Sequence, residues 1–196
     1  MALTVPTPRT PIDGGVARWY EDSLGWATVA GPPVQLVTGL RFDVLELPAA
    51  AGRGVLRRMG AATGPVALMG RRMRLLVAAG SAEELPGLLD WLEWGGISLD
   101  LAGLGADGRM AAPLPPGRGG SGARGAAVWL RAPVPGCEVE SSLPALRSAP
   151  WGGADAPCLV RLVAAAAAEC HRVRLLSART RGSAAQQLSP QRFASS

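Results

Sequence analysis

The stretch Arg41-Phe42-Asp43-Val44-Leu45-Glu46-Leu47-Pro48 decides how the middle of this chain folds. Its mainly apolar run follows the turn residues Thr38-Gly39 and predicts a β-strand over 41–47. Pro48 suits the first turn of a helix, because its fixed φ is helical and its missing N–H would have no partner there. We therefore predict a helix over 49–59, with Val55, Leu56 and Met59 on its buried side.

Further helices and strands alternate along the rest of the chain. A helix is predicted over 13–25, with Asp13 as its cap and Gly25 at its end. Another is predicted over 82–94, where Ser81 and Glu84 have the spacing of a capping box. A hairpin is predicted at Gly70-Arg71-Arg72. The predicted strands are 26–30, 34–37, 41–47, 65–69, 73–78, 97–101, 109–112 and 126–130.

The order of these elements predicts an α+β fold, a single domain with a central mixed or antiparallel β-sheet flanked by helices. A C-terminal helix is predicted over 158–176, with the alanine run 164–168 inside it. We expect a flexible N-terminus over 1–12, one folded domain over 13–176 and a disordered tail over 177–196. The glycine-rich segment 117–125 lacks the spacing of a P-loop, so a surface loop is predicted there.

Composition and motif spacing exclude several classes of protein. No apolar run in the 196 residues is long enough to cross a bilayer, and the N-terminus does not resemble a secretory signal. We therefore expect a soluble, cytoplasmic chain without a membrane partner. Cys137, Cys158 and Cys170 lack the spacing of metal ligands, and the only histidine, His171, points away from its neighbour Cys170 on a helix. Neither a zinc site nor a cofactor is predicted.

The basic residues are all arginines. The chain has 20 of them and no lysine, its net charge is +5, and its isoelectric point is near 10.3. Such a bias, with abundant Ala, Gly and Pro, is typical of a GC-rich genome. It also has a physical consequence, because guanidinium groups pair with phosphate and stack on bases. The charge balance therefore permits an anionic partner such as nucleic acid.

Four segments together resemble a known domain: 38–48, 64–66, 70–77 and 98–116. They are similar to the archaeo-eukaryotic-type primase/polymerase domain, and more narrowly to small actinobacterial proteins with the bifunctional DNA primase/polymerase N-terminal domain. The resemblance covers residues 13–131. It implies a primase/polymerase-like fold and, in active members, nucleotidyl transfer with Mg²⁺ held by converging carboxylates.

The catalytic motifs implied by this resemblance are degenerate here. A family strand ends in Asp-x-Asp, which places two carboxylates on one face; Glu46 matches the first acid and Pro48 the second. In an alternative register Asp43 is the acid and its neighbour on the same face is Leu45. The third acid matches Asp100. The residual catalytic candidates are therefore Glu46, Asp100 and Asp43, which are too few for a two-metal site.

The hairpin in the resemblance carries three arginines. Met73 stands where the family has a phosphate-binding histidine, so that contact is lost. The predicted residues for binding nucleic acid or phosphate are Arg71, Arg72 and Arg74, whose charges attract a phosphate backbone.

We therefore expect a catalytically inactive primase/polymerase-like domain that binds DNA or another protein, without a metal. One alternative is an active DNA primase/polymerase-type nucleotidyltransferase whose atypical site holds Mg²⁺ through Asp43, Glu46 and Asp100. Another is an unrelated soluble protein-interaction module, in which a partner contacts the tryptophans Trp91, Trp94, Trp129 and Trp151. The oligomeric state is left open.

Overall fold

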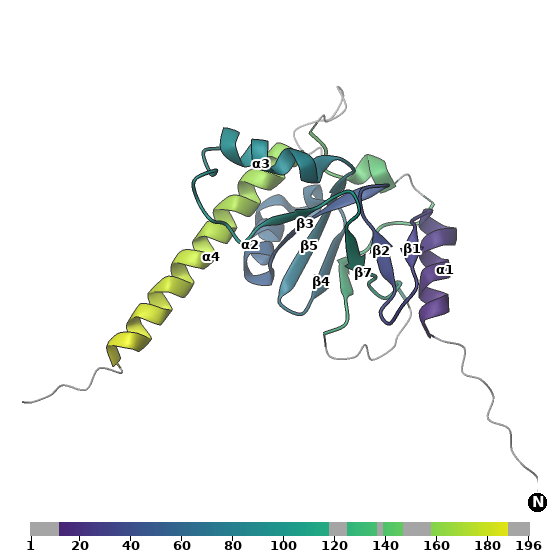
Figure 1. Cartoon of the computed structure of the whole chain (residues 1–196), viewed down its shortest axis with the longest axis horizontal. Coiled ribbons are helices and arrows are strands. Elements are labelled where there is room, and N and C mark those ends of the chain that lie inside the picture. The colour runs from purple at the N-terminus through teal and green to yellow at the C-terminus, as the bar shows by residue number, and fades with distance from the viewer. Residues whose placement is uncertain (1–11, 118–124, 137–138, 147–157, 188–196) are drawn as a thin grey trace, which may run out of the picture.

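The computed structural model describes residues 12–117, 125–136, 139–146 and 158–187 (Figure 1). The predicted α+β class is confirmed. The described helices are α1 (Ile12–Leu24), α2 (Ala49–Met59), α3 (Ser81–Trp91) and α4 (Leu159–Gln187), with 3₁₀ turns at Gly60–Thr63 and Val139–Ser142. The strands are β1 (Thr28–Val29), β2 (Gln35–Val37), β3 (Phe42–Pro48), β4 (Val66–Met69), β5 (Arg72–Ala78), β6 (Ala102–Leu104), β7 (Arg109–Ala111) and β8 (Val128–Arg131). Segments 1–11, 118–124 and 188–196, with Cys137 and Trp151, lie outside the described residues.

The strands form two antiparallel sheets, where one central sheet was predicted. The larger sheet has five strands in the order β6-β3-β5-β4-β8, and the smaller has three in the order β1-β2-β7. The turn at Thr38-Gly39 separates β2 from β3, and β2 pairs with β7 in the smaller sheet. In the larger sheet, β3 pairs with β5 from Phe42 opposite Ala78 to Pro48 opposite Arg72. Segment 42–48 is thus an inner strand, β3, and α2 follows it directly.

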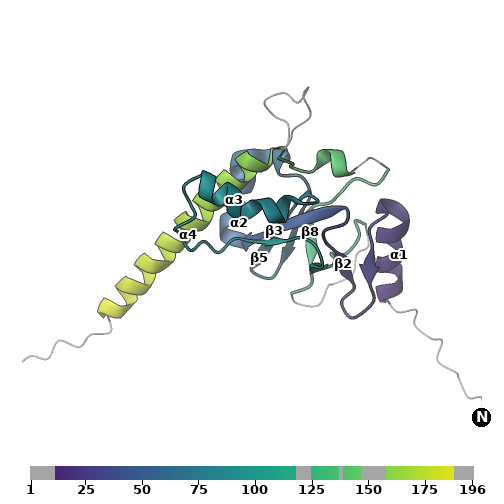
Figure 2. The same ribbon diagram turned by 45° about the horizontal axis from the view of Figure 1, so that its top comes forward.

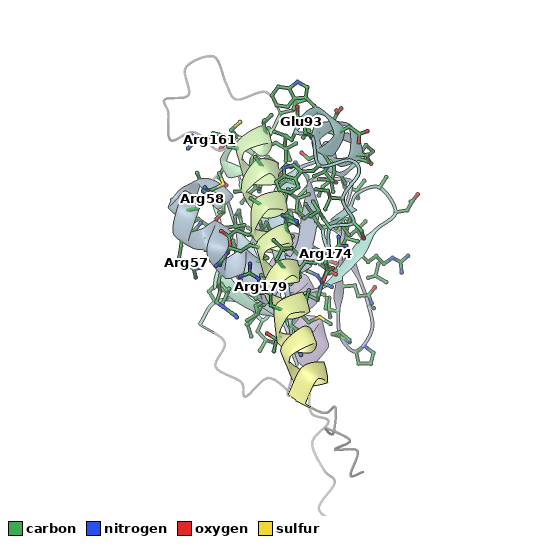
Figure 3. The ribbon with its side chains drawn as sticks, turned by 90° about the vertical axis from the view of Figure 1, so that its left-hand side faces the viewer. Arg57, Arg58, Glu93, Arg161, Arg174 and Arg179 are labelled. Carbon is green, nitrogen blue, oxygen red and sulfur yellow. The ribbon has the colours of Figure 1, made fainter. Side chains whose placement is uncertain are left out.

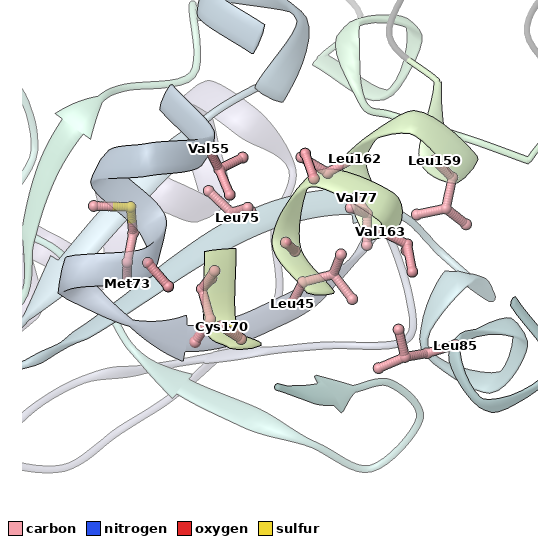
Figure 4. Close-up of a cluster of buried hydrophobic side chains, with 14 of the residues drawn as sticks. Leu45, Val55, Met73, Leu75, Val77, Leu85, Leu159, Leu162, Val163 and Cys170 are labelled. Carbon is pink, nitrogen blue, oxygen red and sulfur yellow. The ribbon is translucent and has the colours of Figure 1, made fainter. Parts of the chain in front are cut away.

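Alternation along β3 sends neighbouring side chains to opposite faces of the larger sheet. Leu45 and Leu47 lie on the face covered by α2, α3 and α4, in a helix-side cluster of buried apolar residues (Figure 4). Phe42 and Val44 lie on the other face, in a second cluster with residues of α1 and the smaller sheet. Both general views show α2, α3 and α4 at one end of the molecule, and α1 with β2 at the other (Figures 1 and 2).

Small residues let α2 pack closely against the sheet and against α4. A Cβ added at Gly52 would collide with Met73 of β5, whose own Cβ would lie 2.9 Å away, and one added at Gly54 would collide with the carboxylate of Glu169 on α4. Ala165 and Ala166 of α4 are buried in the same cluster as Ala51 and Val55 of α2. Glycine and alanine therefore set the spacing of the helical layer.

A hydrogen-bonded tyrosine joins three parts of the second cluster. The hydroxyl of Tyr20 on α1 donates to the carbonyl oxygen of Pro113 at 2.7 Å and accepts from Nε1 of Trp129 on β8 at 2.9 Å. Burial raises the pKa of Tyr20 above its ordinary value, and the Trp129 bond opposes that rise. Trp129 is thus held within the fold by its indole N–H.

The ends of α3 differ from the prediction. The helix begins at Ser81, and its N-cap is Gly80, which has no side chain to bond the first amides. Ser81 is therefore not the cap, and the predicted capping box is wrong. The N–H of Ala82 instead donates to Oδ2 of Asp43 on β3 at 2.9 Å. The helix ends at Trp91, because Glu93 adopts a φ of 65° and the N–H of Trp94 returns to the carbonyl of Leu89.

Three other boundaries also differ. α1 begins at Ile12, so Asp13 lies inside it. Residues 97–101 are not a strand: the carbonyl oxygens of Ser98 and Asp100 accept hydrogen bonds from Arg174 and Cys170 of α4, and β6 starts only at Ala102. The C-terminal helix predicted to end at residue 176 is longer, because α4 continues to Gln187. Among the described residues, no helix is both long and apolar enough to cross a membrane.

Candidate functional site

Glu46 and Arg74 form a cross-strand ion pair on the larger sheet. They stand directly opposite each other in the pairing of β3 with β5, on the face away from α2. Oε2 of Glu46 accepts a hydrogen bond from Nε of Arg74 at 2.7 Å, and Oε1 accepts one from Nε of Arg72 at 3.1 Å. Both carboxylate oxygens of Glu46 are therefore bound to guanidinium groups.

Arg72 extends this pair to Asp100. Its Nη1 donates to Oδ1 of Asp100 at 2.7 Å, while its Nε is held by Glu46. Burial by itself would lower the pKa of Arg72, but the hydrogen bonds and negative charges of Asp100 and Glu46 outweigh it, and the pKa is raised. We call Glu46, Arg72, Arg74 and Asp100 the four-residue ion network. Two of the three carboxylates singled out from the sequence thus come together, with an arginine between them.

Exposure within the ion network increases toward Asp100. The Arg74 side chain is 12% exposed and that of Glu46 is 20% exposed, whereas Asp100 is 66% exposed. A divalent cation at Glu46 would have to displace guanidinium groups from both carboxylate oxygens. The residues as arranged do not fit the Mg²⁺ site that the family resemblance implies. Within the described segments, no group of three or more His, Cys, Asp or Glu side chains could hold a metal ion.

Asp43 lies on the opposite face of β3 and belongs to a different arrangement. It is fully buried, Oδ2 accepts the Ala82 N–H, and Oδ1 has no hydrogen-bond partner among the described atoms. Burial raises the pKa of Asp43, the Ala82 N–H lowers it, and the charge of Glu83 raises it further. Asp43 therefore joins β3 to the N-terminus of α3, and the sheet separates it from Glu46.

The hairpin residues also divide between the two faces. Met73 is buried in the helix-side cluster, so its side chain lies on the opposite face of the sheet from Glu46. Arg71 is exposed at the tip of the turn, and its carbonyl accepts the N–H of Ala49 at 2.8 Å. Of the three hairpin arginines, only Arg71 has a side chain free of the ion network.

Two surface features were not singled out from the sequence. Arg58 of α2 and Arg161 of α4 help to line a cavity of about 330 Å³, and Figure 3 shows Arg57 on the same side of α4. The helical spacing of the arginines within α2 and α4 was a signal for this feature, but which helix faces meet depends on tertiary packing. A groove of about 410 Å³ is lined by residues of α3, of segment 94–101 and of β6, which include Leu89, Trp94 and Ile97.

Cys170 offers no reactive thiol. It is buried on α4, and its Sγ donates to the carbonyl oxygen of Asp100 at 3.5 Å. Burial, aided by the charge of Asp100, raises its pKa to about 12, so the thiolate is scarce at neutral pH. Trp94 packs edge-on against His171 with ring centroids 5.4 Å apart, which further fixes segment 94–101 to α4.

Comparison with known proteins found no family model, no curated protein and no solved structure that matches this chain. The primase/polymerase resemblance therefore stays a prediction from the sequence.

Proposed function

We propose that this protein is a primase/polymerase-like domain without catalytic activity, which works as a nucleic-acid-binding module. The proposal combines the family resemblance of residues 13–131 with the chemistry of the ion network. Nucleotidyl transfer by the two-metal route needs several carboxylates whose oxygens are available to metal ions. Here the matching positions carry Glu46, Pro48 and Asp100, and the two acids neutralise arginines.

The observation that carries the inactive assignment is the pairing of Glu46 with both Arg72 and Arg74. A carboxylate that accepts two guanidinium hydrogen bonds has little remaining negative potential for a cation. Asp43, the third candidate, is buried on the other face and holds α3. An active site built from Asp43, Glu46 and Asp100 would require the ion network to break and Asp43 to lose its bond to the Ala82 N–H.

Support for nucleic acid as the partner comes from charge. The chain carries a net charge of +5, and its basic groups are all guanidiniums, which suit phosphate. Binding to a phosphate backbone releases counterions, so the affinity should fall steeply as salt is added. This salt dependence distinguishes the proposed partner from an apolar protein surface.

Two measurements on the purified full chain test the proposal. Labelled DNA, single-stranded and duplex, is titrated by fluorescence anisotropy at about 50 mM and about 200 mM salt, and we expect binding that weakens at the higher salt. Incorporation of labelled nucleotide on a primed template, with Mg²⁺ or Mn²⁺, is expected to stay at background. DNA synthesis that Asp100→Ala abolishes would overturn the inactive assignment, and the absence of binding at either salt would overturn the nucleic-acid assignment.

A protein-interaction module is the second candidate, favoured by one surface observation. Trp91 is 71% exposed at the end of α3, beside the groove that Trp94 and Ile97 line. Exposed tryptophan is enriched at the centres of protein interfaces. If this candidate is correct, a partner captured from the native host binds with little salt dependence, and Trp91→Ala removes that binding while leaving DNA binding intact.

A further inference from the structure

Positive charge gathers on one side of the helical layer. α2 and α4 together carry eight arginines and one carboxylate, Glu169. Glu169 lies against Gly54 between the two helices, is 15% exposed, and accepts a hydrogen bond from Arg172 at 2.9 Å. Segment 75–108, which includes α3, has the opposite character, with six carboxylates and no arginine. The two flanks of α4 therefore differ in sign.

Helical spacing aligns three arginines of α4. Arg172 and Arg179 follow Arg161 after about three and about five turns, so the three side chains leave the helix in nearly the same direction. Together they span about 27 Å along the helix axis. All three are exposed. α4 thus presents a straight row of guanidinium groups.

α2 adds charge beside the start of this row. Arg57 and Arg58 are exposed near the C-terminus of α2, and Arg58 lines the cavity of about 330 Å³ together with Arg161. In Figure 3, Arg57, Arg58 and Arg161 lie on the α2 side of α4, whereas Arg174 and Glu93 lie on the other side. We call these five exposed residues the arginine face: Arg57, Arg58, Arg161, Arg172 and Arg179.

We propose that the arginine face binds the phosphate backbone of B-form duplex DNA, with the projecting half of α4 at the major groove. This inference rests on the proposed nucleic-acid function and assigns it to a surface other than the predicted hairpin. The hairpin contributes one free arginine, Arg71, because Arg72 and Arg74 belong to the ion network. The arginine face contributes five exposed arginines over two helices.

Two features of the arginine face favour duplex DNA over other polyanions. α2 and α4 contain no Phe, Tyr or Trp, whereas proteins that bind single strands stack bases on aromatic rings. Beyond the body of the molecule, α4 is a bare helix whose described side chains from 174 to 180 are all exposed (Figures 1 and 2). The B-form major groove admits an α-helix, while the major groove of A-form RNA is too narrow.

The test compares two triple variants of the full chain that lose the same charge. The first is Arg57→Gln, Arg58→Gln and Arg179→Gln on the arginine face. The control is Arg18→Gln, Arg71→Gln and Arg109→Gln, three exposed arginines on α1, the hairpin and β7. Both sets lie on the surface, and thermal unfolding of each variant checks that the fold is kept. Each protein is titrated with labelled duplex DNA, single-stranded DNA and duplex RNA across a salt series.

We expect the arginine-face variant to bind duplex DNA roughly 10- to 100-fold more weakly at about 50 mM salt, with a salt slope smaller by up to about 3. The control variant is expected to retain most of the affinity. Equal losses in both variants, or a larger loss in the control, would overturn the inference while the proposed function stands. Tighter binding of single-stranded DNA or duplex RNA would overturn the choice of duplex DNA. If the wild-type chain binds none of the three, the proposed function itself fails.

Discussion

At the residue scale, the role of a carboxylate in this protein depends on the face of β3 that carries it. Asp43 points toward the helical layer, where it accepts the Ala82 N–H near the start of α3. Glu46 points the other way and meets Arg74 across the strand pair. Because side chains alternate along a strand, a shift of one position exchanges these environments. Neither acid could serve in the place of the other.

Replacing Glu46 should destabilise the fold more than replacing an exposed acid. Glu46→Gln leaves the partly buried guanidinium of Arg74 with an uncharged partner and Arg72 with Asp100 as its remaining charged partner. We expect a loss of about 1–3 kcal/mol in the free energy of unfolding, measured with urea. Glu140→Gln is the matched control, because its pair with Arg41 is exposed and should be worth less than about 1 kcal/mol. If both variants lose the same free energy of unfolding, the ion network stabilises the fold no more than an exposed ion pair does.

Asp43 should make the protein less stable as the pH rises above the ordinary pKa of an aspartate. Its folded pKa lies above the ordinary value of 3.8, so over the interval between the two the folded state binds more protons than the unfolded state. Its contribution to the free energy of unfolding is therefore fully present below about 3.8 and decreases as the pH rises through the folded pKa. Asp43→Asn keeps an acceptor for the Ala82 N–H and does not titrate.

The measurement is urea unfolding of the wild-type chain and Asp43→Asn at several pH values from about 3.5 to 7. We expect the stability of the wild-type chain relative to the variant to fall as the pH rises and then to level off. A difference that rises with pH would mean that the folded pKa is depressed.

At the scale of elements, glycine positions separate packing from helix propensity. Gly52→Ala in α2 gains propensity but forces Cβ against Met73, so we expect a net loss of about 1–3 kcal/mol. Gly87→Ala in α3 is the control, since nothing lies within 4 Å of its added Cβ, and it should gain about 0.5–1 kcal/mol. Thermal and urea unfolding measure both; a stabilising Gly52→Ala would show that α2 is less closely packed than described.

The elements that could be predicted from the sequence are those with strong local signals. The strand at Phe42–Pro48, the helix at Ala49–Met59 and the hairpin around Gly70 appear where periodicity, proline and glycine predict them. The failures have tertiary causes. Ser81 has the local pattern of a cap, but a carboxylate from β3 supplies the acceptor, and segment 97–101 bonds to α4 instead of to a strand.

The sequence predicts which residues belong to the candidate site, but not how they contact one another. The sequence named Glu46, Asp100, Arg72 and Arg74, but in separate roles, as acids for a metal and cations for phosphate. Their mutual pairing depends on the register of β3 with β5 and on the position of Asp100 beside β6, and local patterns do not specify either of these. The alignment of Arg57 and Arg58 with α4 likewise depends on how two distant segments pack.

At the scale of the whole molecule, charge is distributed unevenly around α4. The flank with α2 is basic and the flank with α3 is acidic, although the net charge of the chain is only +5. Such a separation orients a protein before contact and increases the rate at which a polyanion meets the matching side. The acidic flank should at the same time disfavour approach from the α3 side.

The projecting half of α4 has one more consequence, which concerns the opening of its backbone. Residues before Arg174 are packed in the helix-side cluster, whereas the described side chains of 175–180 are all exposed, so this part of α4 depends mainly on the helix's own hydrogen bonds. A short helix without packing unfolds and reforms within about a microsecond, and it is marginally stable in water. The two halves of one continuous helix should therefore open with very different free energies.

Hydrogen–deuterium exchange followed by mass spectrometry would measure this gradient. We expect the amides of 175–187 to exchange orders of magnitude faster than those of 162–173, with α2 as a protected internal reference. Uniform protection along α4 would show that something covers its far half. A partner that binds that half as a helix can bind only while it is helical. The observed affinity is then lower than the intrinsic affinity, in proportion to the fraction of molecules in which this end is helical.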